Sequence, residues 1–202
     1  MVGKLGVFIL VAMLISPPKQ KVILFFGDSL TAGYGLNPED AFPAVVNKSL
    51  KNSGVDVRVI NSGLSGETSA GGLTRIDWVL RQPVDVFVLE LGANDGLRGL
   101  PITETRKNLQ QIIDKVKAKN PACKIVLAGM MVPPNMGKEY SDAFRGLFPE
   151  IAKKNNALLV PFLLDGVAGL ERLNQADGIH PTAEGHAIVG ENLAKVLLPL
   201  VK

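Results

Sequence analysis

The sequence predicts an α/β fold in which helices cover both faces of a parallel β-sheet. Short runs rich in Val, Ile, Leu and Phe alternate along the chain with longer segments whose apolar residues recur at helical spacing. Five such runs, each followed by a helical pattern, indicate repeated strand–helix units, and these units build parallel sheets. We therefore expect a three-layer α/β/α sandwich with a five-stranded sheet.

The expected strands are 21–26, 55–60, 84–90, 123–129 and 157–160, and the expected helices are 39–53, 68–82, 103–119, 138–155 and 182–200. Asn120-Pro121 should end the third helix, and Pro181 should open the last one, where a missing amide hydrogen costs little. Trp78 and Leu80 fall on the second helix. We expect both to pack in the core rather than contact a substrate.

Length and composition are those of a single globular domain. The chain has 202 residues, of which 47% are hydrophobic, so it can bury a full core. No repeat, low-complexity run or long linker divides the sequence. A single domain is expected over residues 19–202, and we expect it to be a monomer.

The first 18 residues resemble a signal peptide. Lys4 precedes an apolar run from Leu5 to Ile15, followed by Ser16-Pro17-Pro18. The run is shorter than the roughly 20 residues that span a bilayer, so no stable membrane span is expected in the mature chain. A small-x-small cleavage pattern is missing, and the alternative is an extra apolar element packed on the domain. We favour export, which predicts a periplasmic or secreted protein; the alternative is a cytoplasmic one.

Charge and cysteine content argue against several classes of function. The net charge is +3, with 22 basic and 19 acidic residues spread along the chain, and no basic patch is interleaved with aromatic residues, so nucleic acid is not an expected partner. Cys123 is the only cysteine, so an intrachain disulfide is excluded, and an inert core thiol is expected. His180 and His186 lack the spacing of a zinc pair on one helical face, and no metal is predicted.

Two distant motifs supply the parts of an activated serine. Gly27-Asp28-Ser29-Leu30 directly follows an apolar run, and Asp177-Gly178-Ile179-His180-Pro181 lies near the other end of the chain. A serine hydroxyl needs a base within hydrogen-bond reach and a group that orients this base. Ser29, His180 and Asp177 can fill these roles. Taken singly, each residue also fits a turn or a helix cap.

Two further motifs follow the second and third expected strands, namely Asn61–Thr68 and Gly92–Gly96. In an open parallel α/β sheet, ligands bind at the carboxyl ends of the strands. The backbone amides of Ser29 and Gly66 and the side-chain amide of Asn94 are therefore suitable donors to a developing oxyanion.

The remaining polar candidates near these motifs are expected to be structural. His186 competes with His180 for the role of base, but it falls inside the last helix, where Glu184 is the neighbouring carboxylate. We expect it to be structural or to face solvent. Asp28 and Glu184 are expected to cap helices or anchor loops.

The four motifs, in this order, resemble the four blocks of the SGNH (GDSL) hydrolase family, and the match is closest to the bacterial multifunctional thioesterase I/lysophospholipase L1/arylesterase type. The resemblance covers nearly all of the chain after residue 20. It implies a flavodoxin-like sheet of strand order 2-1-3-4-5, no cofactor, and frequent export. It also implies nucleophile Ser29, base His180, orienting carboxylate Asp177, and oxyanion donors Ser29, Gly66 and Asn94. Ala93 and Pro134 depart from the family pattern.

The expected reaction is hydrolysis of aryl and acyl esters through an acyl-enzyme on Ser29, and we expect it to extend to acyl thioesters and lysophospholipids. The loop from Met130 to Met136 follows the fourth strand, and its residues Val132, Pro133 and Met136 are candidates to line an acyl-chain groove. The alternative is that this loop only covers the core.

Two alternatives to this function stay open. One is a carbohydrate O-acetylesterase, although one Trp and two Tyr leave little material for stacking on a sugar. The other is a non-catalytic module that binds an acyl ligand.

Overall fold

The computed structural model describes residues 20–202, apart from the side chain of Pro134. The apolar segment 1–18 lies outside these residues, so its role as a signal peptide stays a prediction. Among the described residues, none of the helices combines the length and apolarity needed to cross a bilayer.

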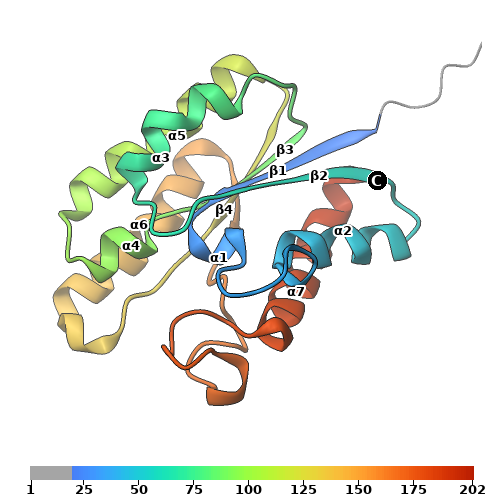
Figure 1. Cartoon of the computed structure of the whole chain (residues 1–202). Helices are drawn as coiled ribbons and strands as arrows, with labels where there is room; N and C mark the ends of the chain where they lie inside the picture. The colour runs from blue at the N-terminus through green and yellow to red at the C-terminus, as the bar shows by residue number, and fades with distance from the viewer. Residues whose placement is uncertain (1–19) are drawn as a thin grey trace, which may run out of the picture.

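Five parallel strands form one sheet in the order β2-β1-β3-β4-β5 (Figure 1). The strands are β1 (Lys21–Gly27), β2 (Val57–Gly63), β3 (Val86–Glu90), β4 (Lys124–Ala128) and β5 (Leu158–Val160). The α-helices are α1 (Ser29–Ala32), α2 (Phe42–Asn52), α3 (Ser69–Val79), α4 (Ala93–Leu97), α5 (Ile102–Lys119), α6 (Lys138–Asn155) and α7 (Ala183–Val201). The short 3-10 helices are η1 (Pro38–Asp40), η2 (Pro134–Met136) and η3 (Glu171–Leu173).

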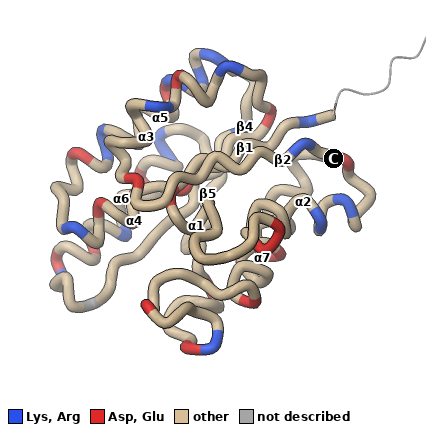
Figure 2. The backbone as a smooth tube through the Cα atoms, in the orientation of Figure 1, with Lys and Arg blue, Asp and Glu red and all other residues tan. Residues whose placement is uncertain are grey.

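The helices form two layers on opposite faces of the sheet. Helices α2 and α7 pack against each other on one face, and α3, α5 and α6 pack side by side on the other (Figure 1). The predicted fold class and strand order are confirmed. Figure 2 shows acidic and basic residues interspersed along these helices.

Burial explains why the central strands read as continuous apolar runs. All five residues of β3, and all but the first of β1, are buried, because helices cover both faces of the sheet. Helix α5 has one apolar face: Leu109, Ile112, Ile113 and Val116 are fully buried at the spacing of successive helical turns. Each such side chain contributes about 1.5–3 kcal/mol when it is removed from water.

Most predicted boundaries differ from the structure by one to three residues, and two of the differences have a clear structural cause. Strand β2 runs from Val57 to Gly63 instead of 55–60, because it pairs with β1 as far as Gly27 opposite Gly63. Glycine is needed at residue 63, since a Cβ there would lie 2.2 Å from the backbone N of Ala32. Helix α7 begins after Thr182, whose side chain caps it by accepting a hydrogen bond from the Gly185 amide. Pro181 precedes this cap and does not open the helix.

The prediction that Trp78 packs in the core is wrong. Its side chain is 66% exposed, whereas Leu80 is buried as expected. The inner face of α3 is formed by Gly72, Ile76 and Val79, which recur at helical spacing. Trp78 comes two residues after Ile76 and so lies on the opposite side of the helix.

Two short helices, α1 and α4, were not predicted. Each begins within three residues of the end of a central strand, β1 or β3. Both helices carry residues of the candidate site, because the chain turns there at the carboxyl edge of the sheet.

Candidate active site

Ser29 is the first residue of α1, directly beyond the end of β1 (Figure 1). The Asp28 side chain caps this helix by accepting a hydrogen bond from the Leu30 amide at 3.0 Å. The helix ends after one turn at Gly33, whose φ of 76° lies in the left-handed region. Ser29 is 8% exposed. The turn therefore holds its hydroxyl at the carboxyl edge of the sheet, in contact with solvent but largely covered.

His180 connects Ser29 with Asp177 across the site. Its Nε2 lies 2.9 Å from Oγ of Ser29, and its Nδ1 lies 2.6 Å from Oδ2 of Asp177. An ionised carboxylate only accepts, so Nδ1 carries the hydrogen and Nε2 is free to accept from the serine hydroxyl. This tautomer is the one that can remove a proton from Ser29.

The Asp177 carboxylate is fixed by the chain that follows it. Its Oδ1 accepts hydrogen bonds from the backbone amides of His180, at 3.0 Å, and Ile179, at 2.9 Å. The backbone hydrogen bond from His180, followed by the one from its imidazole, lowers the pKa of Asp177 to about 2. The side chain therefore stays ionised and can stabilise an imidazolium on His180.

The loop that carries His180 is tied to the segment after α1. The amide of Gln175 donates to the His180 carbonyl at 2.7 Å, and its side-chain Nε2 donates to the carbonyls of Tyr34, at 2.8 Å, and Pro181, at 3.0 Å. The Tyr34 ring lies against the imidazole, with ring centroids 4.6 Å apart. These contacts hold the imidazole above Ser29 and cover part of its face.

The side-chain amide of Asn94 bridges the segments that carry Ser29 and Gly66. Its Nδ2 donates to Oδ2 of Asp28 and to the carbonyl of Glu67, both at 3.1 Å. These acceptors are the direct sequence neighbours of Ser29 and Gly66. The structure thus brings the three predicted oxyanion donors to one place. The Ser29 amide also lies in the first turn of α1, where amides lack intrahelical acceptors.

Gly66 is held in a conformation that suits glycine. Its φ is +78°, and a Cβ added there would meet nothing within 4 Å. Glycine is therefore needed for the backbone conformation, while the space beside it stays open. The Gly66 carbonyl accepts a hydrogen bond from Nη2 of Arg98 at 3.0 Å. This contact restrains the peptide between Gly66 and Glu67.

Of the three candidates for an acyl groove, two lie beside the segment of Asn94. A Cβ at Gly96 would lie 2.4 Å from Val132, so this side chain packs on α4, and Met136 approaches Gly99 just beyond that helix. Met136 also lines a surface groove with Ile102 and Tyr140. Pro133 is exposed, and its carbonyl accepts a hydrogen bond from the Met136 amide.

Among the residues at the site that carried no prediction from the sequence are Tyr34, Glu90 and Arg98. Glu90 could have been noticed as a carboxylate within the apolar run of a strand buried on both faces. Tyr34 and Arg98 act through contacts with distant segments, so their sequence context contains no comparable signal.

His186 and Cys123 are outside this site. Nδ1 of His186 accepts a hydrogen bond from the Phe42 amide at 3.1 Å, in a buried position between α7 and α2. Burial raises the pKa of the Cys123 thiol to about 12, so the reactive thiolate is suppressed. Within residues 20–202, no three His, Cys, Asp or Glu side chains gather as a metal site would require.

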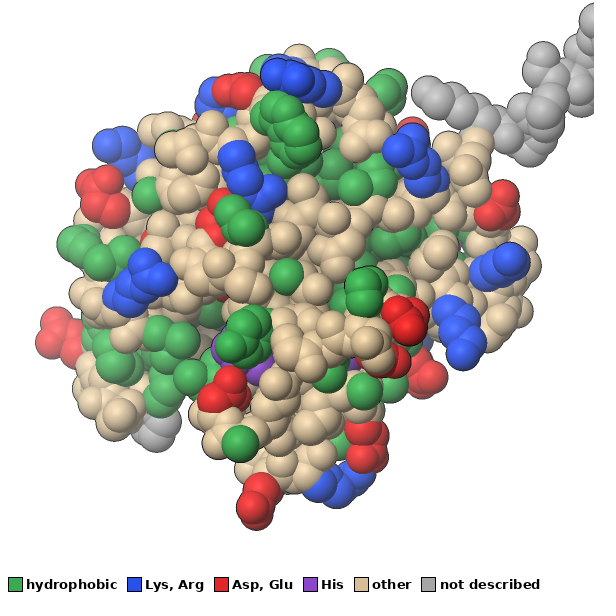
Figure 3. All heavy atoms as spheres, viewed as in Figure 1, with side chains coloured by type: hydrophobic (Ala, Val, Ile, Leu, Met, Phe, Trp, Pro, Cys, Tyr) green, Lys and Arg blue, Asp and Glu red, His purple; other side chains and the backbone are tan. Residues whose placement is uncertain are grey.

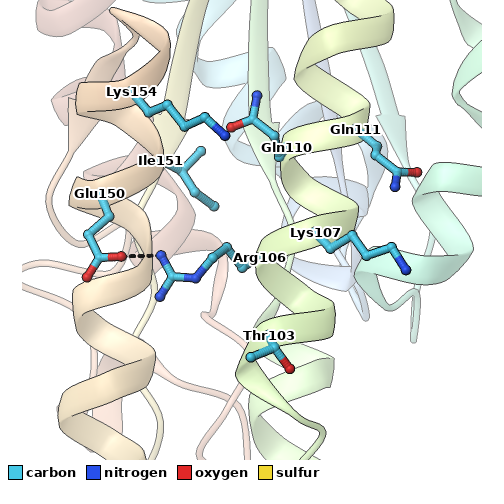
Figure 4. Close-up of a pocket in the computed structure, with 8 residues that line it drawn as sticks. All are labelled: Thr103, Arg106, Lys107, Gln110, Gln111, Glu150, Ile151 and Lys154. Atoms are coloured by element: carbon cyan, nitrogen blue, oxygen red, sulfur yellow. Dashed lines mark hydrogen bonds and ion pairs between the residues drawn. The ribbon is translucent and has the colours of Figure 1, made fainter.

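A separate polar groove lies between α5 and α6 (Figure 4). Arg106 and Glu150 form an ion pair across it, and Ile151 supplies an apolar patch. The groove contains none of the predicted site residues.

Comparison with known proteins identifies the family. A family model for the GDSL-like Lipase/Acylhydrolase family matches residues 25–188. The chain is 38% identical over 182 residues to Esterase TesA of Pseudomonas aeruginosa, with 90% of each protein covered. It is 38% identical over 180 residues to thioesterase 1/protease 1/lysophospholipase L1 of Escherichia coli K12, covering 89% of this chain and 84% of that protein.

A solved structure agrees in both sequence and fold. It is the psychrotrophic esterase EstA from a Pseudoalteromonas species, in a form inhibited by monoethylphosphonate. The TM-score is 0.82 at 34% identity, and the match covers 87% of this chain and 96% of that one. The predicted family resemblance is confirmed. The chain belongs to the GDSL-like lipase/acylhydrolase family and is an ester-hydrolysing enzyme.

Proposed function

We propose that the chain is a serine esterase that cleaves aryl and acyl esters, acyl thioesters and lysophospholipids through an acyl-enzyme on Ser29. The observation that carries the proposal is the hydrogen-bonded chain from Ser29 Oγ to His180 Nε2, at 2.9 Å, and from His180 Nδ1 to Asp177, at 2.6 Å. An activated serine needs this connection between nucleophile, base and orienting carboxylate. We also propose that residues 19–202 act as one hydrolase domain.

In the first half of the reaction, His180 Nε2 takes the proton of Ser29 as Oγ attacks the substrate carbonyl. The carbonyl oxygen becomes an oxyanion, which accepts hydrogen bonds from the Ser29 and Gly66 amides and the Asn94 side chain. His180 then passes the proton to the leaving alcohol or thiol, and the bond between this group and the acyl carbon breaks. The product of this half is an ester between the acyl group and Ser29.

In the second half, His180 takes a proton from water as the water oxygen attacks the acyl-enzyme. The tetrahedral intermediate collapses, His180 returns the proton to Ser29 Oγ, and the carboxylic acid leaves. Asp177 stabilises the imidazolium in both halves. A serine mechanism is also supported by the relative EstA, which was solved in a form inhibited by monoethylphosphonate.

Apolar side chains around the site support acyl substrates. Leu64, Leu97, Met131 and Ile179 are each 40% or more exposed, and each lies within three residues of a site residue or a strand end. Tyr34 is exposed as well, and its ring lies tilted against that of His180. Figure 3 shows hydrophobic side chains (green) next to histidine (purple) on the front face. An acyl chain attached to the reacting carbonyl would find apolar surface there. The names of the relatives TesA and thioesterase 1/protease 1/lysophospholipase L1 support the same classes of substrate.

The test is hydrolysis of p-nitrophenyl esters from acetate to palmitate, with acyl-CoA and lysophosphatidylcholine alongside. Wild type is compared with Ser29→Ala and with Ser53→Ala, which removes an exposed hydroxyl at the end of α2. Ser29→Ala should lose roughly 10⁴-fold or more in kcat, whereas Ser53→Ala should keep wild-type rates. Turnover that survives in Ser29→Ala would refute the serine mechanism.

The same measurement separates the alternatives. Activity confined to acetate would favour a carbohydrate O-acetylesterase. Labelling by a fluorophosphonate separates an enzyme from a binding module, since only an activated serine reacts with it at an appreciable rate. Absence of both turnover and labelling at Ser29 would favour a module that binds an acyl ligand.

A further inference from the structure

Two carboxyl groups are buried side by side beneath the nucleophile. Glu90 is the last residue of β3 and lies opposite Gly27 in the pairing with β1, so it is adjacent to the turn of Asp28 and Ser29. Asp28 and Glu90 are both 0% exposed. A buried carboxylate is costly unless a cation or several hydrogen bonds compensate for its lost hydration. The pair therefore requires an explanation that the proposed mechanism does not give.

The four carboxyl oxygens differ in their partners. Oε2 of Glu90 accepts hydrogen bonds from the Asp28 amide, at 3.2 Å, and from the Thr31 hydroxyl, at 2.7 Å. Asp28 accepts from the Leu30 amide through Oδ1 and from Asn94 Nδ2 through Oδ2. Oε1 of Glu90 has no hydrogen-bond partner among the described residues. It is thus the oxygen that remains available to carry a proton.

The charged groups around the pair do not neutralise it. Arg75 approaches from α3, but its guanidinium is paired with Glu67 and donates to the Gly27 carbonyl at 3.3 Å. His180 contacts Ser29 and acts on Asp28 through its charge when it is protonated. Neither cation forms an ion pair with Asp28 or Glu90.

We propose that Glu90 is a positioning residue that is protonated at neutral pH and carries its proton on Oε1, so that the pair holds a single negative charge, on Asp28. In this state the pair holds the nucleophile turn and Asn94 in place without a second charge beneath the oxyanion donors. The inference rests on the proposed function, because the positioned groups are those of the serine mechanism.

The physical basis is the behaviour of two acids in one buried site. Burial, and then the charge of Asp28, raises the pKa of Glu90 well above its usual range. Burial also raises the pKa of Asp28, to about 6, although hydrogen bonds from Leu30 and Asn94 lower it. At pH 7 the pair therefore holds one proton. Asp28 keeps the charge, because it receives the amide hydrogens of Leu30 and Asn94.

A single negative charge, located on Asp28, suits the oxyanion site above the pair. An ionised Asp28 accepts the hydrogen bond that turns the nitrogen of Asn94, rather than its oxygen, toward the site. A second negative charge on Glu90 would oppose the oxyanion that forms nearby. A neutral Glu90 still accepts hydrogen bonds from the Asp28 amide and the Thr31 hydroxyl. It thus stabilises the turn around Ser29 without repelling the oxyanion.

Infrared spectroscopy tests the protonation state directly in the wild-type chain. At pH 7 we expect a C=O stretch from a protonated carboxyl group, which should move to lower frequency when glutamate is labelled with ¹³C at its side-chain carboxyl. The band should be absent in Glu90→Gln and unchanged in Glu139→Gln, which alters an exposed glutamate. The proposal would be overturned if no such band were present at pH 7, or if the band did not shift with the glutamate label. A labelled band that persists in Glu90→Gln would overturn it as well.

Kinetics with a neutral replacement test the positioning role. Glu90→Gln keeps a neutral carbonyl acceptor and should hold kcat/KM within about threefold of wild type. Glu90→Leu has a similar volume but removes the acceptor, and should lower kcat at least about tenfold with little change in KM. An equal loss in both variants would overturn the proposal.

If Glu90→Leu does not fold, the infrared result and Glu90→Gln still decide the question. Failure of the serine mechanism would show up as turnover in Ser29→Ala and would leave the infrared band in place. The two failures are thus distinguishable.

Discussion

The buried His186 provides a prediction whose size follows from the structure. Its Nδ1 accepts a hydrogen bond from the Phe42 amide, and its ring stacks on that of Phe42 with centroids 5.9 Å apart. An accepting nitrogen cannot be protonated, and the side chain is 1% exposed. Burial, followed by the charge of His180, lowers the pKa of His186 from 6.5 to about 4, against a smaller opposing effect of Asp40. The folded protein therefore keeps this imidazole neutral.

The sign of the effect on stability follows from this difference. In the unfolded chain, His186 binds a proton as the pH falls below 6.5, whereas the folded chain resists protonation until about pH 4. Stability is therefore lost as the pH falls through this window. At about 1.36 kcal/mol for each pKa unit, the full loss is about 3 kcal/mol, of which about 2 kcal/mol falls between pH 7 and pH 4.5.

The assay is urea unfolding of wild type and His186→Asn at these two pH values, followed by circular dichroism. Asparagine does not titrate, and its Oδ1 can accept the Phe42 amide. The variant should be less stable at pH 7, because ring packing is lost, but its stability should fall by about 2 kcal/mol less on acidification. Asp28 and Glu90 titrate in the opposite direction, but both proteins contain them, so their contribution cancels in the difference.

Two results would refute this reasoning. Equal losses of stability in both proteins would mean that His186 titrates as freely when folded as when unfolded. A loss of turnover in folded His186→Asn as large as that in Ser29→Ala would mean that His186, rather than His180, is the base.

Three further substitutions have defined outcomes. Asp177→Asn should lower kcat by roughly 10⁴-fold, because the wrong tautomer of the imidazole is held; a loss below about tenfold in steady-state kinetics would contradict the role assigned to this carboxylate. Asn94→Ala should lower kcat by roughly 10²–10³-fold with little change in KM, and kinetics within about threefold of wild type would argue against an oxyanion donor there. Gly129→Ala should destabilise by about 1–3 kcal/mol in thermal unfolding, since the new Cβ would lie 2.3 Å from the Pro161 carbonyl oxygen. The matched control is Gly146→Ala in helix α6, where an added Cβ would meet no atom closer than 4.0 Å. This substitution should stabilise the protein by about 0.5–1 kcal/mol. A Gly129→Ala protein as stable as this control would contradict the argument.

The fold was predictable because its signals are local. Apolar runs such as that of β3 are continuous because helices cover both faces of the sheet. The amphipathic pattern of α5 predicts which face of the helix is buried. One error depended on a tertiary contact, because pairing with β1 extends β2 to Gly63. The error at Trp78 was local, because its offset of two residues from Ile76 places it on the exposed side of α3.

The residues of the candidate site also fall into those that the sequence identifies and those that it does not. Ser29, Asn94 and His180 could be identified because their types and order along the chain are characteristic, and the structure brings them to one edge of the sheet. Arg98 could not, because its contact joins segments that no sequence spacing relates, and the sequence marks Glu90 only as a carboxylate within an apolar run. Arg98 reaches the Gly66 carbonyl from beyond α4, and the Glu90 side chain matters only because it is buried next to Asp28.

Asn94 connects the buried pair with the chemistry. Both hydrogens of its Nδ2 are engaged, one by the Asp28 carboxylate and one by the Glu67 carbonyl. A substrate oxyanion carries charge and is therefore a stronger acceptor than the neutral carbonyl of Glu67, but not than an ionised Asp28. We expect the hydrogen bound to Glu67 to be shared with the oxyanion, while the bond to Asp28 keeps the amide in place. The charge retained on Asp28 would then position the donor before the substrate arrives, which is the condition under which such a donor stabilises a transition state without reorganisation.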